Sequence, residues 1–294
     1  MRKESNKNQS QCQQPSPLGA TLTRKKTSQA VPTSPNNIVD FAESLLGWKL
    51  EAKQRELLTG PNKRVILNCT RQWGKSWMAA VALLFHAIHQ PESLSIVAGP
   101  TLRQSAELLR KVKDLSLRLG LASTRDGINR HSIVLGNRSR IVALPGNSPD
   151  AIRGFSGVTM LVIDEAAMVS DDVYTAVRPM LTQKDGAIWL LSTPKDKDGF
   201  YYREFSDTHP PDHPSGQPLT KEDWRKVIVP ATECPRFRPE HLEAEKASLG
   251  SRLFAQEFLC QFVSVNEGLF DEQWFDDVFS AVPPLRIPPC PRLL

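Results

Sequence analysis

Short apolar runs alternate with longer helical patterns through the middle of the chain. Six runs predict strands: Arg64–Cys69, Leu94–Ala98, Ser139–Leu144, Met160–Asp164, Ala187–Ser192 and Lys226–Val229. None of them alternates strictly between apolar and polar residues, which is typical of strands that are buried on both faces. We therefore expect a mainly parallel central sheet.

Two long stretches between these strands predict helices. Ser76–His89 is apolar nearly all round, so we expect a buried helix. Leu102–Leu119 places apolar residues at three- to four-residue spacing, which predicts an amphipathic helix with a basic outer face. Strands that alternate with helices indicate an α/β fold, in which helices flank a mainly parallel sheet.

Both ends of the chain differ in composition from this central part. Residues 1–36 are rich in polar residues and proline, and we expect a disordered tail because few apolar groups are available for burial. We assign residues 37–230 to the core of the fold and 231–275 to a helical C-terminal part of the same region. Residues 276–294 have the composition of a proline-rich linker.

Charge and cysteine content narrow the class of protein. The 294-residue chain has a net charge of +5, and residues 1–36 account for all of it with six basic groups and one acidic group. The body therefore gives no net-charge argument for nucleic-acid binding. The chain start lacks the apolar core of a signal peptide, and no apolar stretch is long enough to span a bilayer, so we expect no membrane association. Five cysteines without a CxxC pair argue against a zinc ribbon and fit a reducing cytosol.

The segment between the first predicted strand and the first long helix has the features of a phosphate-binding loop. Its residues are Cys69, Thr70, Arg71, Gln72, Trp73, Gly74, Lys75 and Ser76. The last three match the pattern G-x-x-x-x-G-K-[ST], and Cys69 replaces its leading glycine. Gly74 lets backbone N–H groups turn toward phosphates, Lys75 can reach the β- and γ-phosphate oxygens, and the Ser76 hydroxyl can ligate Mg²⁺. The alternative is a chance Gly-Lys-Ser at the start of a helix.

A pair of carboxylates lies at the end of the predicted strand Met160–Asp164. This strand ends in Asp164 and Glu165, and ligands bind at the carboxyl edge of an open parallel sheet. Asp164 would hold Mg²⁺ through water, and Glu165 would orient the water that attacks the γ-phosphate. Considered alone, the pair could equally be a solvated acidic turn.

Five more residues are candidates for the same chemistry. Arg71 lies inside the loop, where an arginine can stabilise transition-state charge in cis. Ser192 ends the fifth predicted strand and Thr193 follows it. Both would lie beside the expected γ-phosphate and could couple hydrolysis to movement. Gln54 could read the adenine edge, with an exposed helical residue as the alternative. Arg153 could act on a neighbouring subunit, with a surface salt bridge as the alternative.

In their order along the chain, these motifs resemble the ATPase domain of the tailed-phage terminase large subunit, the DNA-packaging motor. The resemblance covers roughly residues 40–275 and rests on Gln54, the loop 70–76, Ala98-Gly99-Pro100-Thr101, Arg153-Gly154, Val162-Ile163-Asp164-Glu165-Ala166-Ala167, Leu191-Ser192-Thr193-Pro194 and the stretch 254–262. It implies a RecA-like phosphate-loop ATPase fold of the additional-strand, catalytic-glutamate type.

The resemblance also implies a role for each candidate. ATP would be bound by Gln54 and residues 70–76, and Mg²⁺ by Ser76 and Asp164. The residues implied to be catalytic are Glu165, Lys75 and Arg71, and those implied to couple hydrolysis to movement are Ser192 and Thr193. Arg153 would be the trans-acting group.

The implied activity is ATP hydrolysis that drives double-stranded DNA into a procapsid. The implied partners are double-stranded DNA, the portal protein, the terminase small subunit and further copies of this chain in a ring. The implied setting is the cytoplasm of an infected or lysogenic bacterial host. Full family members continue into an RNase H-like nuclease domain, and we expect neither that domain nor DNA cleavage from this chain.

Two other functions remain open at this stage. A two-lobe helicase shares the phosphate loop and the Asp-Glu pair, but the residues from Lys226 to the end are too few for a second lobe. A prophage remnant would bind nucleotide yet hydrolyse none without neighbouring subunits, since trans-acting groups carry much of the rate in related enzymes. The basic helix Leu102–Leu119 is a candidate DNA-contacting surface, with a solvated face as the alternative.

Overall fold

The computed structural model describes residues 36–121, 129–206 and 224–264, all within one compact unit, Val31–Leu294. The predicted tail, apart from residue 36, lies outside these ranges. The predicted linker and residues 265–275 of the predicted helical part lie outside them as well. The assignment of these segments stays a prediction.

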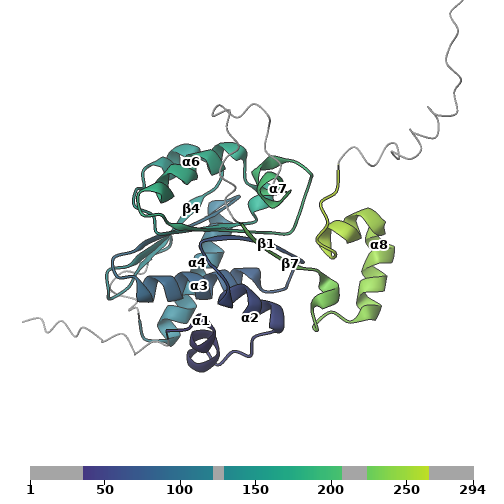
Figure 1. Cartoon of the computed structure of the whole chain (residues 1–294), viewed down its shortest axis with the longest axis horizontal. Helices are drawn as coiled ribbons and strands as arrows, with labels where there is room; N and C mark the ends of the chain where they lie inside the picture. Colours follow the sequence, from purple (N-terminus) through teal and green to yellow (C-terminus); the bar gives the residue numbers. More distant parts are fainter. Residues whose placement is uncertain (1–35, 122–128, 207–223, 265–294) are drawn as a thin grey trace, which may run out of the picture. The chain divides into compact units, whose positions relative to one another are not determined.

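Seven strands form one sheet at the centre of the described fold, in the order β3-β4-β2-β5-β6-β1-β7 (Figure 1). They are β1 (Arg64–Cys69), β2 (Leu94–Gly99), β3 (Ser132–Val134), β4 (Arg140–Pro145), β5 (Met160–Asp164), β6 (Ala187–Ser192) and β7 (Arg225–Val229). Neighbouring strands are parallel except for the edge pair β3–β4. The six predicted strands are confirmed to within one residue at each end. Strand β3 was not predicted, because three residues are too short to show a periodic pattern.

Helices cover both faces of this sheet (Figure 1). They are α1 (Ile38–Asp40), α2 (Ala52–Thr59), α3 (Lys75–His89), α4 (Leu102–Arg118), α5 (Pro149–Arg153), α6 (Asp171–Thr182), α7 (Gly199–Ser206) and α8 (Pro239–Glu257), with a π-helical turn at Phe41–Leu45 and 3₁₀ turns at Ala166–Met168 and Ala231–Glu233. The two predicted helices are confirmed as α3 and α4. In α4 the fully buried stripe runs through Ser105, Leu108, Leu109, Val112, Leu115 and Ser116, so Leu102 and Ala106 lie at its border.

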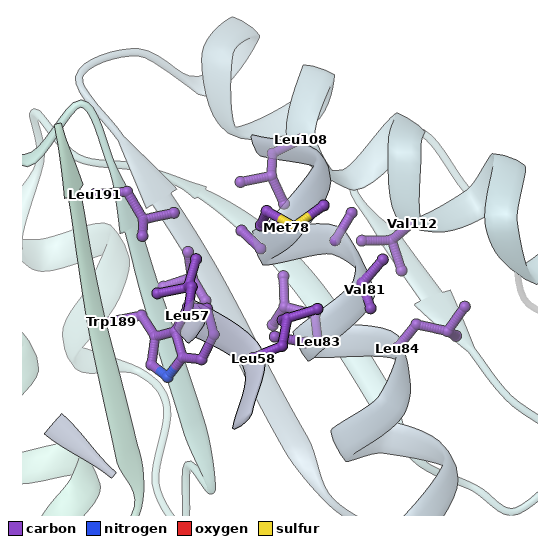
Figure 2. Close-up of a cluster of buried hydrophobic side chains, with 14 of the residues drawn as sticks. Leu57, Leu58, Met78, Val81, Leu83, Leu84, Leu108, Val112, Trp189 and Leu191 are labelled. Atoms are coloured by element: carbon purple, nitrogen blue, oxygen red, sulfur yellow. The ribbon is translucent and has the colours of Figure 1, made fainter. Parts of the chain in front are cut away.

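Alternate strand residues enter two separate hydrophobic clusters. On β1, Val65 and Leu67 pack on the side of α2, α3 and α4, whereas Ile66 packs on the side of α6 and α7. Figure 2 shows part of the first cluster, where Leu83 of α3 and Trp189 of β6 meet the leucines of α2. Because apolar residues are needed on both faces, the strands show no polar alternation.

The strand order decides which loops come together. Strand β6 lies between β1 and β5, and the three strands are parallel. The loops that follow them therefore leave the same edge of the sheet. This inserted strand agrees with the additional-strand arrangement that the resemblance implied. No helix in the described ranges is both long and apolar enough to cross a membrane.

Candidate active site

Residues 70–74 join β1 directly to α3 and form a tight loop. Gln72 and Gly74 have φ angles of 61° and 105°, in the left-handed region that favours glycine. Cys69, in contrast, is the last residue of β1 and pairs in register with Val229 of β7. Cys69, which stands where the phosphate-loop pattern has its first glycine, thus has an extended backbone that does not require glycine.

The backbone of this loop is arranged to bind an anion. The N–H groups of residues 71–74 donate to no described residue, and they lead into the N-terminus of α3. Thr70 differs, because its N–H donates to the Val229 carbonyl at 3.0 Å and its hydroxyl to the Glu257 carbonyl at 3.0 Å. Consecutive free N–H groups ahead of a helix form a site for phosphate oxygens.

The acidic pair at the end of β5 meets the first turn of α3. Lys75 Nζ lies 2.6 Å from Glu165 Oε1, and the Ser76 hydroxyl donates to Asp164 Oδ2 at 3.1 Å. Glu165 has a φ of 53°, a left-handed conformation that is rare outside glycine. Such strain is found at sites where the surrounding structure fixes the backbone. The two motifs, separated by nearly ninety positions along the chain, therefore form one cluster.

Burial controls the charge of these groups. Burial raises the pKa of Asp164, and the positive charge of Lys75 only partly offsets this effect. For Lys75, burial lowers the pKa, but attraction from Glu165 and Asp164 outweighs it and leaves the pKa above its ordinary value. The lysine is therefore charged at neutral pH.

Ser192 and Thr193 lie next to this cluster. The Ser192 hydroxyl accepts from the Ala167 N–H at 3.2 Å and donates to the Thr193 carbonyl at 2.7 Å. The end of β6 is thereby tied to the turn that follows Glu165. The Thr193 hydroxyl is buried and has no hydrogen-bond partner among the described residues.

The three remaining candidates, Gln54, Arg71 and Arg153, have hydrogen-bond or ion-pair partners within the chain. Gln54 is half-buried: its Oε1 accepts from the Glu51 N–H at 3.1 Å, and its Nε2 donates to the Trp73 carbonyl at 3.4 Å. The alternative, that Gln54 is an exposed helical residue, is wrong, because the half-buried side chain supports the loop. The Trp73 side chain is 1% exposed and packs in the core, so it can offer a nucleotide only its backbone.

The two arginines are paired with carboxylates outside the cluster. Arg71 is 73% exposed at its side chain and pairs with Glu257, with Nε 2.5 Å from Oε2. Arg153 pairs with Asp150, three residues earlier in α5, at 3.2 Å. The surface salt bridge that was the alternative for Arg153 is thus present.

Three basic side chains on the predicted outer face of α4 contact other groups of the same chain. Arg110 pairs with Glu107 at 3.0 Å, and Lys111 Nζ lies 5.7 Å from the centre of the Trp77 ring. Lys113 donates to the Arg130 carbonyl at 3.2 Å. These contacts favour a structural and solvated role over a free DNA-contacting surface.

Sequence reasoning missed three residues that hold the loop. Arg236 donates to the carbonyls of Gln72 and Trp73, and Glu51 pairs with Arg236 at 2.9 Å. Glu257 at the end of α8 holds Arg71. No local pattern marks them, because Arg236 and Glu257 lie more than 160 positions from the loop.

A family model described as "Terminase large subunit, T4likevirus-type, N-terminal" matches residues 66–277, which is most of the chain. The chain belongs to this terminase large-subunit family. A curated relative, the terminase large subunit of Thermus phage G20c, is 26% identical over 251 residues, covering 77% of this chain and 51% of the relative. The chain thus spans about half the length of the curated relatives that it matches.

Solved structures of terminases share the fold. The large-terminase ATPase domain of Thermus phage P74-26 matches with a TM-score of 0.62 and 24% identity, over 76% of this chain and 98% of that domain. The large terminase of a thermophilic bacteriophage, solved in complex with ADP, matches with a TM-score of 0.59 and 14% identity, over 76% of this chain and 57% of that one. The predicted RecA-like α/β fold is confirmed.

Proposed function

We propose that this chain is the ATP-hydrolysing motor domain of a phage DNA-packaging terminase. The observation that carries the proposal is the single cluster of free loop N–H groups, Lys75, Ser76, Asp164 and Glu165 at one sheet edge. Phosphoryl transfer needs charge neutralisation and an oriented water, and these groups supply both. Family membership and the ADP complex of the related large terminase from a thermophilic bacteriophage support ATP as the nucleotide.

Nucleotide binding would rearrange the ion pairs of the site. The β- and γ-phosphates would be held by the loop N–H groups and the N-terminus of α3. Lys75 would turn from Glu165 to the phosphate oxygens, which frees the Glu165 carboxylate to accept a hydrogen bond from the attacking water. Arg71 would act in cis on the γ-phosphoryl group after leaving Glu257. Gln54 would reach the adenine edge only by giving up its bonds to Glu51 and Trp73.

The cluster has a place that fits Mg²⁺. Ser76 Oγ and Asp164 Oδ2 lie 3.1 Å apart, and Asp164 is 7% exposed with a pKa raised by burial. A divalent cation would favour the charged carboxylate, and a hydroxyl and a carboxylate are oxygen ligands of the kind that Mg²⁺ takes. Ser76 would hold the ion directly and Asp164 through water. When bound, Mg²⁺ would neutralise charge on the β- and γ-phosphate oxygens.

Coupling to DNA belongs to the same proposal. Movement of Ser192 and Thr193 would report hydrolysis to a DNA-contacting surface, and Arg153, exposed on α5, would serve a neighbouring subunit in a ring. The proposed partners are double-stranded DNA, the portal protein and the terminase small subunit, in the cytoplasm of the bacterial host. Nuclease activity is not proposed for this chain.

The test is steady-state ATPase activity of the purified chain with Mg²⁺, at several protein concentrations. Glu165→Gln should lower kcat at least 100-fold while nucleotide binding persists, because an uncharged amide cannot polarise the attacking water or accept its proton. The matched control, Glu240→Gln at an exposed position of α8, should behave like the wild type. A wild-type rate that rises more than linearly with concentration would support ring assembly.

Other outcomes separate the alternatives. Nucleotide binding without hydrolysis at any concentration would indicate a silent remnant. Absence of nucleotide binding in the wild type would refute the phosphate-loop assignment itself.

A further inference from the structure

Arg236 lies outside the candidate active site, yet it holds the phosphate loop by two consecutive carbonyl groups. Its Nη1 donates to the Gln72 carbonyl at 3.3 Å and its Nη2 to the Trp73 carbonyl at 2.5 Å. Its Nε lies 2.9 Å from Glu51 Oε1, so the guanidinium is anchored on its other side. Gln54 adds a second donor to the Trp73 carbonyl.

Peptide geometry gives these contacts a consequence for phosphate binding. In a planar trans peptide, a carbonyl and the N–H of the next residue point in opposite directions. The Arg236 guanidinium binds the Gln72 and Trp73 carbonyls on one side of the loop, its outer side. The N–H groups of Trp73 and Gly74, which belong to the same two peptides, therefore point to the opposite, inner side. Both N–H groups belong to the set that donates to no described residue.

The loop needs such external support. Gln72 has a left-handed φ of 61°, and a strained non-glycine backbone of this kind persists only where its surroundings determine it. A charged donor on a carbonyl also polarises the peptide, which makes the N–H of the same peptide a stronger donor.

We infer that Arg236 is a positioning residue that turns the N–H groups of Trp73 and Gly74 toward the β-phosphate of a nucleoside di- or triphosphate. Arg236 itself does not touch the nucleotide. Glu51, which forms the capping box of α2 with Gln54, completes this outer support by anchoring the guanidinium. The inference rests on the proposed nucleotide binding but does not depend on hydrolysis.

The experiment measures ADP affinity by calorimetry in the presence of Mg²⁺. Arg236→Gln should weaken ADP binding roughly tenfold, since it removes charged hydrogen bonds from two peptides. Arg238→Gln is the matched control: this arginine is exposed, its side chain has no polar contact with described residues, and ADP affinity should stay unchanged. A purely structural role for Arg236 would instead lower the melting temperature of the free protein without a selective loss of affinity.

Glu51→Gln provides a second, milder variant. Glutamine keeps an acceptor for the α2 cap but loses the charge that anchors Arg236, so a two- to fivefold loss of ADP affinity is expected. The double variant should lose no more affinity than Arg236→Gln alone, because the two residues act as a unit. In nuclear magnetic resonance spectra, the amide signals of Trp73 and Gly74 should shift in both single variants and not in Arg238→Gln.

The outcomes are distinct. Wild-type affinity for ADP in a folded Arg236→Gln protein would overturn the inference and leave the proposed function standing. If Arg236→Gln does not fold, the folded Glu51→Gln protein decides, and wild-type affinity there would also overturn the inference. A wild-type chain that binds no ADP would refute the proposed function and this inference together.

Discussion

At the scale of single residues, the two cationic side chains expected to act on phosphate are already ion-paired with carboxylates. Lys75 is paired with Glu165 and Arg71 with Glu257. A nucleotide phosphate must compete with these carboxylates for each cation. Binding would therefore free Glu165 at the same time as it engages Lys75, which would link access to the proposed catalytic carboxylate to the presence of the nucleotide.

A histidine on α3 predicts a pH dependence of stability. His86 Nε2 lies 2.9 Å from the Thr159 hydroxyl, and burial lowers the pKa of His86 to about 4. The unfolded chain, with a histidine pKa of about 6.5, binds the proton first, so stability is lost as pH falls from about 6.5 toward 4. Between pH 7 and pH 5, the wild type should lose about 1–2 kcal/mol more unfolding free energy than His86→Gln.

Urea denaturation at the two pH values measures this difference. His89, exposed on the same helix, gives the control, because His89→Gln should retain the wild-type pH dependence. Equal pH dependence in the wild type and His86→Gln would show that His86 titrates alike in the folded and unfolded chains.

At the scale of elements, α3 was predicted from its apolar content and proves to be the central helix of one layer. It contacts α4, and its residues Met78–Leu84 are all buried. A helix without an exposed face must pack on several sides, which agrees with its position beside α2, α4 and the sheet.

Two leucines test how much this burial contributes. Leu83 of α3 is fully buried, whereas Leu117 of α4 is 42% exposed. Leu83→Ala should lower the free energy of unfolding by about 2–5 kcal/mol, because it removes buried methyl groups and leaves a cavity. Leu117→Ala should change it by less than about 0.5 kcal/mol. Chemical denaturation checks both values, and similar losses in the two variants would contradict the described packing of α3.

At the scale of the whole described unit, the C-terminal part of the chain returns to the phosphate loop. Asn68 donates to the Cys260 carbonyl at 3.0 Å, and the Thr70 hydroxyl donates to the Glu257 carbonyl. Arg71 adds its ion pair with Glu257. The end of α8 is therefore linked to the loop that would sense the nucleotide. Helix α8 also has a non-helical residue, Gly250, in its interior.

This link predicts a change in hydrogen exchange at the end of α8. Arg71→Gln removes the ion pair with Glu257, and exposed pairs contribute about 0.2–1 kcal/mol, so amides 254–258 should exchange roughly two- to fivefold faster. Adding ADP to the wild type should act in the same direction if Arg71 turns toward phosphate. Arg110→Gln on α4 also breaks an exposed pair and should leave these amides unchanged. Unaltered exchange in Arg71→Gln would mean that the pair does not restrain α8.

The strands, the two long helices and the loop that joins β1 to α3 were predictable because each depends on residues close together in the chain. Apolar periodicity and a Gly-Lys-Ser at a helix start are local signals. The meeting of Lys75 with Glu165 was also predictable, since loops that follow parallel strands share one edge. Strand β3 was not predictable, because three residues show no periodic pattern. The partners of the basic face of α4 were not predictable either, because Trp77 and Arg130 reach it only once the chain is folded.

The α/β class, the order of the core elements and the polar residues at one sheet edge follow from the amino-acid sequence alone. The pairing of Arg71 with Glu257, the support of the loop by Gln54 and the contact of Arg236 with two loop carbonyls depend on the folded chain. The physical reason is the range of the interactions. Helix and strand patterns arise from neighbours a few residues apart. Contacts between separate elements, 19 positions apart for Gln54 and Trp73 and more than 160 for the two arginines, exist only once the chain path is formed.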